Sequence, residues 1–200
     1  MKFFFRRTSS LIVTFPSPSS QMGSFDDNDD GLIFFGTIDG VHCPINEPRP
    51  FSTQWSSHKF GGKPGVNYEL VVCLNKPKLA WCYGPIKPGK FNDISTFRRK
   101  LKRVMEYEHP GLRLIGDRGY RGEPELVSTK NELDPEELTE FKDRACARHE
   151  TFNQHLKCFK CLKNRWRHGV ENHKIAFEAC CTLVMLQINS GSQTLFDPYP

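Results

Sequence analysis

The sequence has no long hydrophobic run. None of its 200 residues lie in a stretch approaching the ~18 apolar residues of a membrane-spanning helix, so we expect neither a membrane protein nor a membrane partner. It also has no visible internal repeat, and its formal net charge of +5 is small. Its 38% of hydrophobic residues suffice for a packed core and argue against global disorder. The length fits one soluble domain with a tail.

The first 21 residues contain no acidic residue. They carry Lys2, Arg6 and Arg7 among many serines, which is the bias of an organelle presequence. Their apolar run, Leu11 to Val13, is shorter than the ~7–15 residues of a secretory signal. We expect residues 1–30 to be a disordered leader or an artefact of the gene start, and an organelle presequence is the less favoured alternative.

Eight cysteines lie mostly inside apolar or helical patterns, which favours reduced thiols and a nuclear or cytoplasmic protein. Cys158 and Cys161 form a C-x2-C that His168 and His173 extend to C-x2-C-x6-H-x4-H. The gap of six residues is shorter than the ~12 of a zinc finger, so we do not expect zinc and favour cysteines packed in a helical core. A zinc or thiol-redox protein using Cys158 and Cys161 remains an alternative.

The hydrophobic pattern predicts a mixed α/β chain. We expect strands over residues 32–38, 68–74, 79–83 and 112–115, a loop over 44–65, and helices over 94–105, 135–166 and 172–189. Asp93 is a candidate N-cap of the first helix, and Asp134, followed by Pro135, of the second. The order β-β-β-α-β-α-α predicts a mixed sheet flanked by helices.

The charge is strongly partitioned along the chain. Residues 85–103 hold seven basic residues and one acidic residue, and residues 141–174 hold nine basic and three acidic residues. Residues 123–140 between them are acidic. Basic residues interleaved with aromatic side chains are suited to contact with a phosphate backbone. A single basic helix, by contrast, is more simply explained as a helix face exposed to solvent. Two basic segments in one small domain favour a nucleic-acid partner.

Three acids are notable for their positions. Asp39 ends the first strand in GTIDG, Asp117 ends the fourth in IGDRGY, and Glu150 lies within the long helix in ARHETFN. If the two strands are neighbours, the aspartates converge; Cys146, Glu150, Asn153 and Lys157 share one line of the helix. Carboxylates are the hard oxygen ligands that Mg²⁺ needs. Taken singly, each acid has an ordinary explanation, such as an Asp-Gly turn at Asp39.

Around these acids the sequence resembles DDE-superfamily transposases and endonucleases of the Harbinger and bacterial insertion-sequence type. The segments that carry the resemblance are GTIDGVHCPINEP (36–48), SSHKFGGKPGVNYEL (56–70), GPIKPGKFND (84–93), GDRGYRGEPE (116–125) and FKDRACARHETFNQHLKCFKCLKNRWRHG (141–169). The resemblance implies an RNase H-like catalytic domain over residues 31–200. It also implies that Asp39, Asp117 and Glu150 hold two Mg²⁺ or Mn²⁺ ions for cleavage and strand transfer of DNA phosphodiesters.

The same resemblance implies roles for other residues. Asp93 matches an acid before a helix, where it would cap the helix or support the metal. The candidate DNA contacts are His58, Lys59, Arg98, Arg148, Asn153, Lys157 and Lys160. Family members usually carry a helix-turn-helix before the first aspartate, and some rely on a separate DNA-binding helper protein. We expect no helix-turn-helix here, so a catalytically silent DNA-binding or protein-interaction domain is the rival function.

Overall fold

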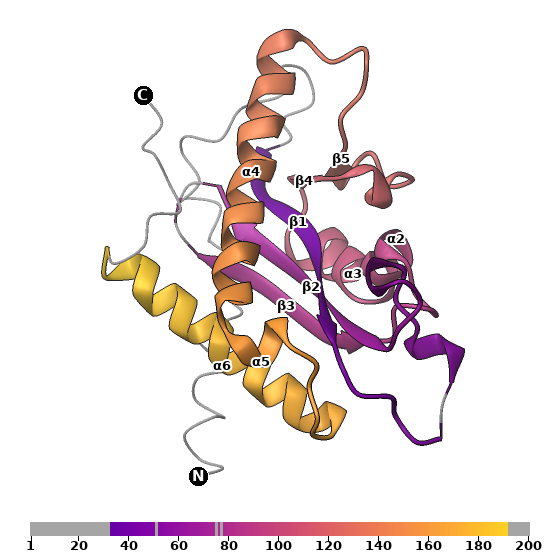
Figure 1. Cartoon of the computed structure of the whole chain (residues 1–200). Coiled ribbons are helices and arrows are strands. Elements are labelled where there is room, and N and C mark those ends of the chain that lie inside the picture. Colours follow the sequence, from indigo (N-terminus) through magenta and orange to yellow (C-terminus); the bar gives the residue numbers. More distant parts are fainter. Residues whose placement is uncertain (1–32, 51, 75, 77, 192–200) are drawn as a thin grey trace.

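The computed structural model describes residues 33–50, 52–74, 76 and 78–191 (Figure 1). The predicted leader at residues 1–30 lies outside the described residues. Five strands form one sheet in the order β3-β2-β1-β4-β5. They are β1 (Ile33–Pro44), β2 (Gly65–Cys73), β3 (Leu79–Ile86), β4 (Leu112–Gly116) and β5 (Val127–Ser128). The first three are antiparallel neighbours, while β4 runs parallel to β1 and β5 parallel to β4.

The four predicted strands are confirmed, and β1 to β3 are longer than expected. The prediction that Asp39 ends the first strand is wrong: β1 continues to Pro44, and Asp39 pairs with Leu70 within the strand. The two-residue strand β5 was not predicted, because a pair of residues is too short to show a hydrophobic alternation. Within the predicted loop, two short 3₁₀ helices form, η2 (Thr53–Trp55) and η3 (His58–Phe60). A third, η4 (Arg118–Tyr120), follows β4 directly. The helices are α2 (Asp93–Arg99), α3 (Leu101–Glu108), α4 (Glu136–Cys158), α5 (Lys160–Lys163) and α6 (Val170–Asn189).

The predicted helix over residues 94–105 is two helices, and its predicted cap is wrong. Lys100 has non-helical backbone angles (φ −137°, ψ −61°) and separates α2 from α3. The N-cap of α2 is Asn92, whose side chain accepts a hydrogen bond from the Ser95 backbone N–H at 3.1 Å. Asp93 is therefore the first helical residue, and its carboxylate is not used as the cap.

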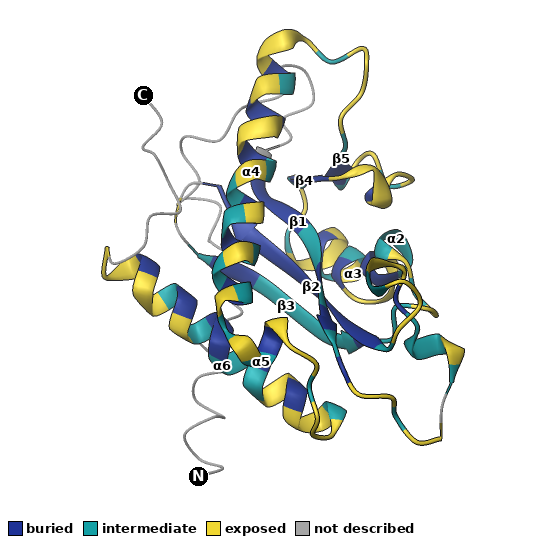
Figure 2. Ribbon diagram, in the orientation of Figure 1, coloured by how far each residue is buried: buried dark blue, intermediate teal, exposed yellow. Residues whose placement is uncertain are grey.

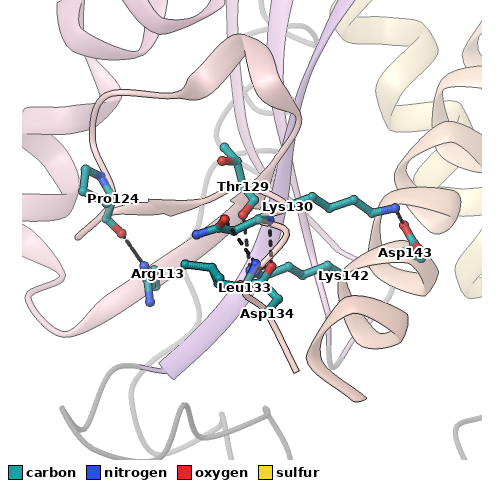
Figure 3. Close-up of polar contacts among 9 residues, drawn as sticks. Arg113, Pro124, Thr129, Lys130, Leu133, Asp134, Lys142 and Asp143 are labelled. Carbon is teal, nitrogen blue, oxygen red and sulfur yellow. Dashed lines mark hydrogen bonds and ion pairs between the residues drawn. The ribbon is translucent and has the colours of Figure 1, made fainter. Parts of the chain in front are cut away.

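The predicted helix over residues 135–166 also ends early, because the chain is extended at Phe159 (φ −74°, ψ 117°). Trp166 lies beyond α5 and bridges to Ile45. The predicted cap Asp134 is wrong as well: Pro135 is the N-cap of α4, and no side chain caps the helix there. Asp134 instead accepts a hydrogen bond at 2.7 Å from the buried Lys142 ammonium, as Figure 3 shows. Burying a lysine requires such a partner, which explains the position of Asp134.

Helices cover both faces of the sheet (Figures 1 and 2). One face packs against α4, α5 and α6, through a cluster that includes Tyr68, Phe152 and Phe177. The other packs against α2 and α3, through a cluster that includes Val71, Phe97 and Met105. The strands alternate between the two faces because successive side chains of a strand point to opposite sides. Among the described helices, none has the length and apolar character of a membrane span.

Candidate active site

The parallel pairing of β1 with β4 brings Asp39 and Asp117 to the same part of the sheet. Ile38 pairs with Gly116, so each aspartate is the residue that follows a paired position. The predicted convergence of the two strands is therefore confirmed. Asp117 caps η4: its Oδ1 accepts a hydrogen bond from the Gly119 backbone N–H at 2.8 Å. This turn carries the chain away and leaves the carboxylate exposed.

Asp93 is a third carboxylate at this place, brought in by the start of α2. A Cβ on Gly119 would lie 2.6 Å from Asp93 Oδ2 and 2.9 Å from Asp117 Oδ1. A Cβ on Gly40 would lie 3.2 Å from Asp93 Oδ1. The two glycines thus leave the space into which the carboxylates of Asp93 and Asp117 approach one another. Any side chain at Gly119 would displace both groups.

The carboxylates affect one another's ionisation. Burial raises the pKa of Asp39 to about 6; the Gly40 N–H bonded to it opposes the rise, and the charges of Asp117 and Asp93 add to it. Burial also raises the pKa of Asp93, and the charge of Asp117 adds to that. Lys59 lowers both pKa values because its positive charge stabilises the ionised forms. A cluster of like charges with one nearby lysine is a site that favours further positive charge.

One line of α4 faces these acids. The Asn153 side-chain amide donates a hydrogen bond to Asp39 Oδ2 at 2.8 Å. Burial raises the pKa of Cys146 to about 11, and Asp143, Asp39 and Asp117 contribute to the rise. Glu150 lies on the same line of α4. It is four residues after Cys146 and three before Asn153, and residues three or four apart share a helix face. The Glu150 side chain is exposed, and no contact in the described structure joins its carboxylate to Asp39, Asp93 or Asp117.

The predicted DNA contacts divide into two groups. His58 and Lys59 are exposed on η3, and both act electrostatically on Asp93. Lys157 donates hydrogen bonds to the His42 carbonyl and to Cys43 Sγ, two strand residues just beyond Asp39. His58, Lys59 and Asn153 therefore lie near the carboxylates, and Lys157 lies farther along β1.

The other three predicted contacts point elsewhere. Arg98 forms an ion pair with Glu123 at 2.6 Å and also bonds the Gly122 carbonyl, so it ties the loop after η4 to α2. Arg148 donates to the Leu74 carbonyl at 3.4 Å, at the far end of β2. Lys160 is exposed on α5, beyond Lys157. The structure does not bring these three to the carboxylates.

Sequence reasoning missed a buried acid beneath the site. Glu69 is 1% exposed on β2, where it pairs with Gly40, and its Oε1 accepts a hydrogen bond from the Trp81 indole N–H at 3.1 Å. Burial raises its pKa to about 8; the Trp81 hydrogen bond opposes this, and the charge of Asp93 adds to it. The sequence feature that could have revealed this buried acid is the single carboxylate within the apolar stretch YELVVCL. Asn67, two residues earlier, lies beside Gly40 as well.

The residues present fit a divalent ion in their donor chemistry. Asp39, Asp93 and Asp117 offer hard oxygen atoms, and Asn153 Oδ1 is buried beside Asp39 with no hydrogen-bond partner in the described structure. Within the described ranges, however, no three or more His, Cys, Asp and Glu side chains are arranged to hold a metal. Glu150 would have to swing inward to complete a set of ligands.

The cysteine–histidine pattern is not assembled either. Cys158 is exposed, and Cys161 Sγ lies 3.7 Å from Cys180 Sγ. His173 is fully buried, where its Nδ1 shares a hydrogen bond of 2.9 Å with the Tyr68 hydroxyl. The two halves of the pattern are thus bound to different partners.

A cavity of about 590 Å³ opens beside β5 and not at the carboxylates. Arg113, Lys130 and Lys142 line it, along with the loop residues around Pro124 and Asp134 (Figure 3). Each of these bases is already engaged: Arg113 with the Pro124 carbonyl, Lys130 with Asp143 and Lys142 with Asp134. The candidate site is therefore the group of carboxylates Asp39, Asp93 and Asp117, of which Asp117 is exposed.

Comparison with known proteins identifies the family of the chain. Residues 38–185, well over half of the chain, match the family model for DDE superfamily endonucleases. The chain belongs to this family. Asp39, Asp93, Asp117 and Glu150 all lie within the matched residues. No curated protein and no solved structure matches the chain. The mixed sheet flanked by helices is consistent with the RNase H-like fold of DDE endonucleases.

Proposed function

We propose that this DDE superfamily endonuclease cleaves DNA phosphodiesters with the help of Mg²⁺ or Mn²⁺ held by Asp39, Asp117 and Glu150. The observation that carries the proposal is the approach of three carboxylates from separate elements: Asp39 on β1, Asp117 at the end of β4 and Asp93 at the start of α2. Burial raises the pKa of Asp39 and of Asp93, and Asp117 adds to both rises. Bound cations would relieve this repulsion.

The residues would divide the work as follows. Asp39 and Asp117 would hold the ions on the rigid sheet, Glu150 would complete the set from α4, and Asp93 would support it from α2. Asn153 would orient Asp39 through the hydrogen bond to its Oδ2. Lys59 and His58 would contact a phosphate beside the carboxylates. When bound, two ions supply the charge that activates water or a 3′-OH for in-line attack on phosphorus, without a covalent enzyme intermediate.

A nicking assay tests the proposal. Purified full-length chain is mixed with supercoiled plasmid and Mn²⁺, with wild type compared with Asp39→Asn and Glu150→Gln. The control is Glu140→Gln, an exposed acid on the same helix that lies away from the site line. We expect wild type and Glu140→Gln to nick equally and the two site variants to be inactive. Equal nicking by all four proteins would refute the assignment.

A second candidate function is a DNA-binding domain without cleavage. It is favoured by the exposed Glu150 and by the lack, among the described residues, of a ready-made metal ligand set. It predicts salt-dependent DNA binding by wild type and by Asp39→Asn, and no nicking by either. Under both functions DNA is the proposed partner.

A further inference from the structure

Five of the eight cysteines belong to one apolar cluster between the sheet and the helices α4 to α6. Cys43 on β1, Cys82 on β3, Cys161 on α5 and the adjacent Cys180 and Cys181 on α6 all belong to or pack on one apolar cluster. Within it the thiols form two pairs. Cys161 Sγ and Cys180 Sγ are 3.7 Å apart, and Cys82 lies near Cys181, where it adds to the rise in the pKa of that thiol.

The two pairs differ in how an oxidant would reach them. Cys161 is only partly buried, whereas Cys180 is 5% exposed and Cys181 is fully buried. The sequence around Cys161 is strongly basic: Lys160 and Lys163 are exposed on the same short helix. An anionic oxidant is attracted to that surface. Glutathione disulfide is such a molecule, with net negative charge and a sulfur–sulfur bond that a thiolate can attack.

We propose that Cys161 and Cys180 are an oxidation site that reacts with glutathione disulfide to form an intramolecular disulfide between α5 and α6. The Cys161 thiol loses its proton, and the thiolate attacks one sulfur of glutathione disulfide, which releases one glutathione thiolate and leaves a mixed disulfide. Cys180 then loses its proton and attacks the Cys161 sulfur, which releases the second glutathione. The two glutathione thiolates take up the two protons. The protein loses two hydrogen atoms in total, and one glutathione disulfide becomes two glutathione molecules.

The order of the two attacks follows from burial. Cys180 is nearly enclosed, and burial raises its pKa to about 12, so it does not react with an external oxidant first. Once Cys161 carries glutathione, the Cys180 sulfur, 3.7 Å from Cys161 Sγ, is placed to attack the mixed disulfide. The exposed Cys158, three residues earlier, is the competing thiol on the protein surface. This inference does not depend on the endonuclease function.

The product would connect two elements that touch only by packing. Residues 161 and 180 are 19 apart in the chain, and closing a loop of this size restricts the unfolded state. We expect the oxidised protein to melt roughly 5–10 °C higher than the reduced protein. The connection fixes α5, which directly follows the end of α4 that carries Lys157.

The test is intact-mass and peptide mass spectrometry of reduced full-length protein after incubation with glutathione disulfide. We expect wild type to lose two hydrogens and to yield one cross-linked peptide pair containing Cys161 and Cys180. Cys180→Ser should stop at the mixed disulfide, with one glutathione added. Cys161→Ser should lose no hydrogens, and the matched control Cys158→Ser should behave as wild type. A neutral disulfide, 2-hydroxyethyl disulfide, should react more slowly.

The results that overturn the proposal are equally definite. They are a wild-type protein that keeps all its thiols, a cross-link through another pair such as Cys82–Cys181 or Cys158–Cys161, or loss of two hydrogens by Cys161→Ser. If a serine variant fails to fold, the wild-type peptide map alone decides the question. Nicking activity is measured separately on the same samples, so an inactive enzyme leaves this result intact.

Discussion

Two groups of buried ionisable side chains lie on different parts of the sheet and respond oppositely to burial. At the candidate site, burial raises the pKa of Asp39 to about 6 and that of Glu69 to about 8. Against α4 and α6, burial lowers the pKa of His149 and of His173 to about 4. The cause is the same, because low-dielectric surroundings disfavour the charged form. The sign differs because one group becomes anionic and the other cationic.

The two groups also differ in their partners. His149 Nδ1 is 2.8 Å from the Thr37 hydroxyl, and His173 Nδ1 is bonded to the Tyr68 hydroxyl, so each neutral imidazole has a neutral partner in the core. Both groups also contain buried atoms without a partner in the described structure: Nε2 of His149 and His173, and Glu69 Oε2 and Asn153 Oδ1 at the site. The difference is chemical, because the unpartnered oxygen atoms at the site are the type of ligand that a hard cation prefers.

The largest expected effect separates function from stability at the site. Asp39→Asn should lower Mn²⁺-dependent nicking by roughly 1,000-fold, because it removes a proposed metal ligand. At pH 8 the same change should raise the free energy of unfolding by about 1–3 kcal/mol, because it removes a carboxylate whose charge is disfavoured there. Urea unfolding and plasmid nicking measure the two effects. A variant that is both inactive and less stable would show that Asp39 has a structural role.

The next effect concerns the pH dependence of stability. The pKa of Glu69 is raised from its ordinary 4.5 to about 8, so between these values the folded protein holds a proton that the unfolded chain has lost. Stability from this group is therefore present below about pH 4.5 and lost as pH rises to 8. Between pH 4.5 and 8 the free energy of unfolding of Glu69→Gln should therefore fall by about 2–4 kcal/mol less than that of wild type. Urea unfolding at several pH values measures this difference.

The histidines give the opposite dependence, which the same titrations would reveal at lower pH. The pKa of His149 and of His173 is lowered from 6.5 to about 4, so the unfolded chain takes up protons that the folded protein does not. Stability from these groups is lost as pH falls from 6.5 toward 4. A Glu69→Gln protein with an unchanged profile above pH 6.5 would contradict the assignment to Glu69.

A third effect is stabilisation by divalent ions. Mg²⁺ or Mn²⁺ at about 100-fold excess over its dissociation constant should stabilise wild type by about 2–3 kcal/mol. Thermal unfolding with and without the ion, in chelator-treated protein, measures this. Asp117→Asn should show little stabilisation, and Tyr68→Phe should respond as wild type. Equal stabilisation of the Asp117→Asn and wild-type proteins would place the ion elsewhere.

The smallest effect lies in the histidine region. Tyr68→Phe removes the hydroxyl bonded to His173 Nδ1 and leaves that nitrogen buried without its partner. We expect a loss of about 1–3 kcal/mol in unfolding free energy and no change in nicking. Phe keeps the ring stacked on Phe177 at 3.7 Å, so the loss reports the hydrogen bond and not the packing. A loss of nicking would show that the two regions are coupled.

Much of the fold followed from local pattern. The strands of YELVVCL and LRLI, the αL glycine that ends α6 at Gly191 (φ 74°), and the apolar stripe of α4 could all be read from the sequence. The cap positions and helix ends could not. Aspartate is a favourable N-cap residue, but neither predicted cap acts as one. The Asp93 carboxylate instead approaches Asp117, and the Asp134 carboxylate pairs with the ammonium group of Lys142. Tertiary partners override a capping preference of about 1 kcal/mol.

The sequence by itself predicted that Asp117 directly follows a buried strand, because the apolar run LRLI ends just before it. It did not predict that β1 continues past Asp39, because Asp-Gly is also a common turn pair. It also determined which residues share a line of α4, since that depends on helical spacing alone. Only the tertiary structure decided that Asp93 approaches Asp117, that Glu69 lies beneath Gly40, and that Cys161 meets Cys180. Those contacts join residues that are distant in the chain. Their distances are set by how whole strands pair and whole helices pack, which no local sequence pattern encodes.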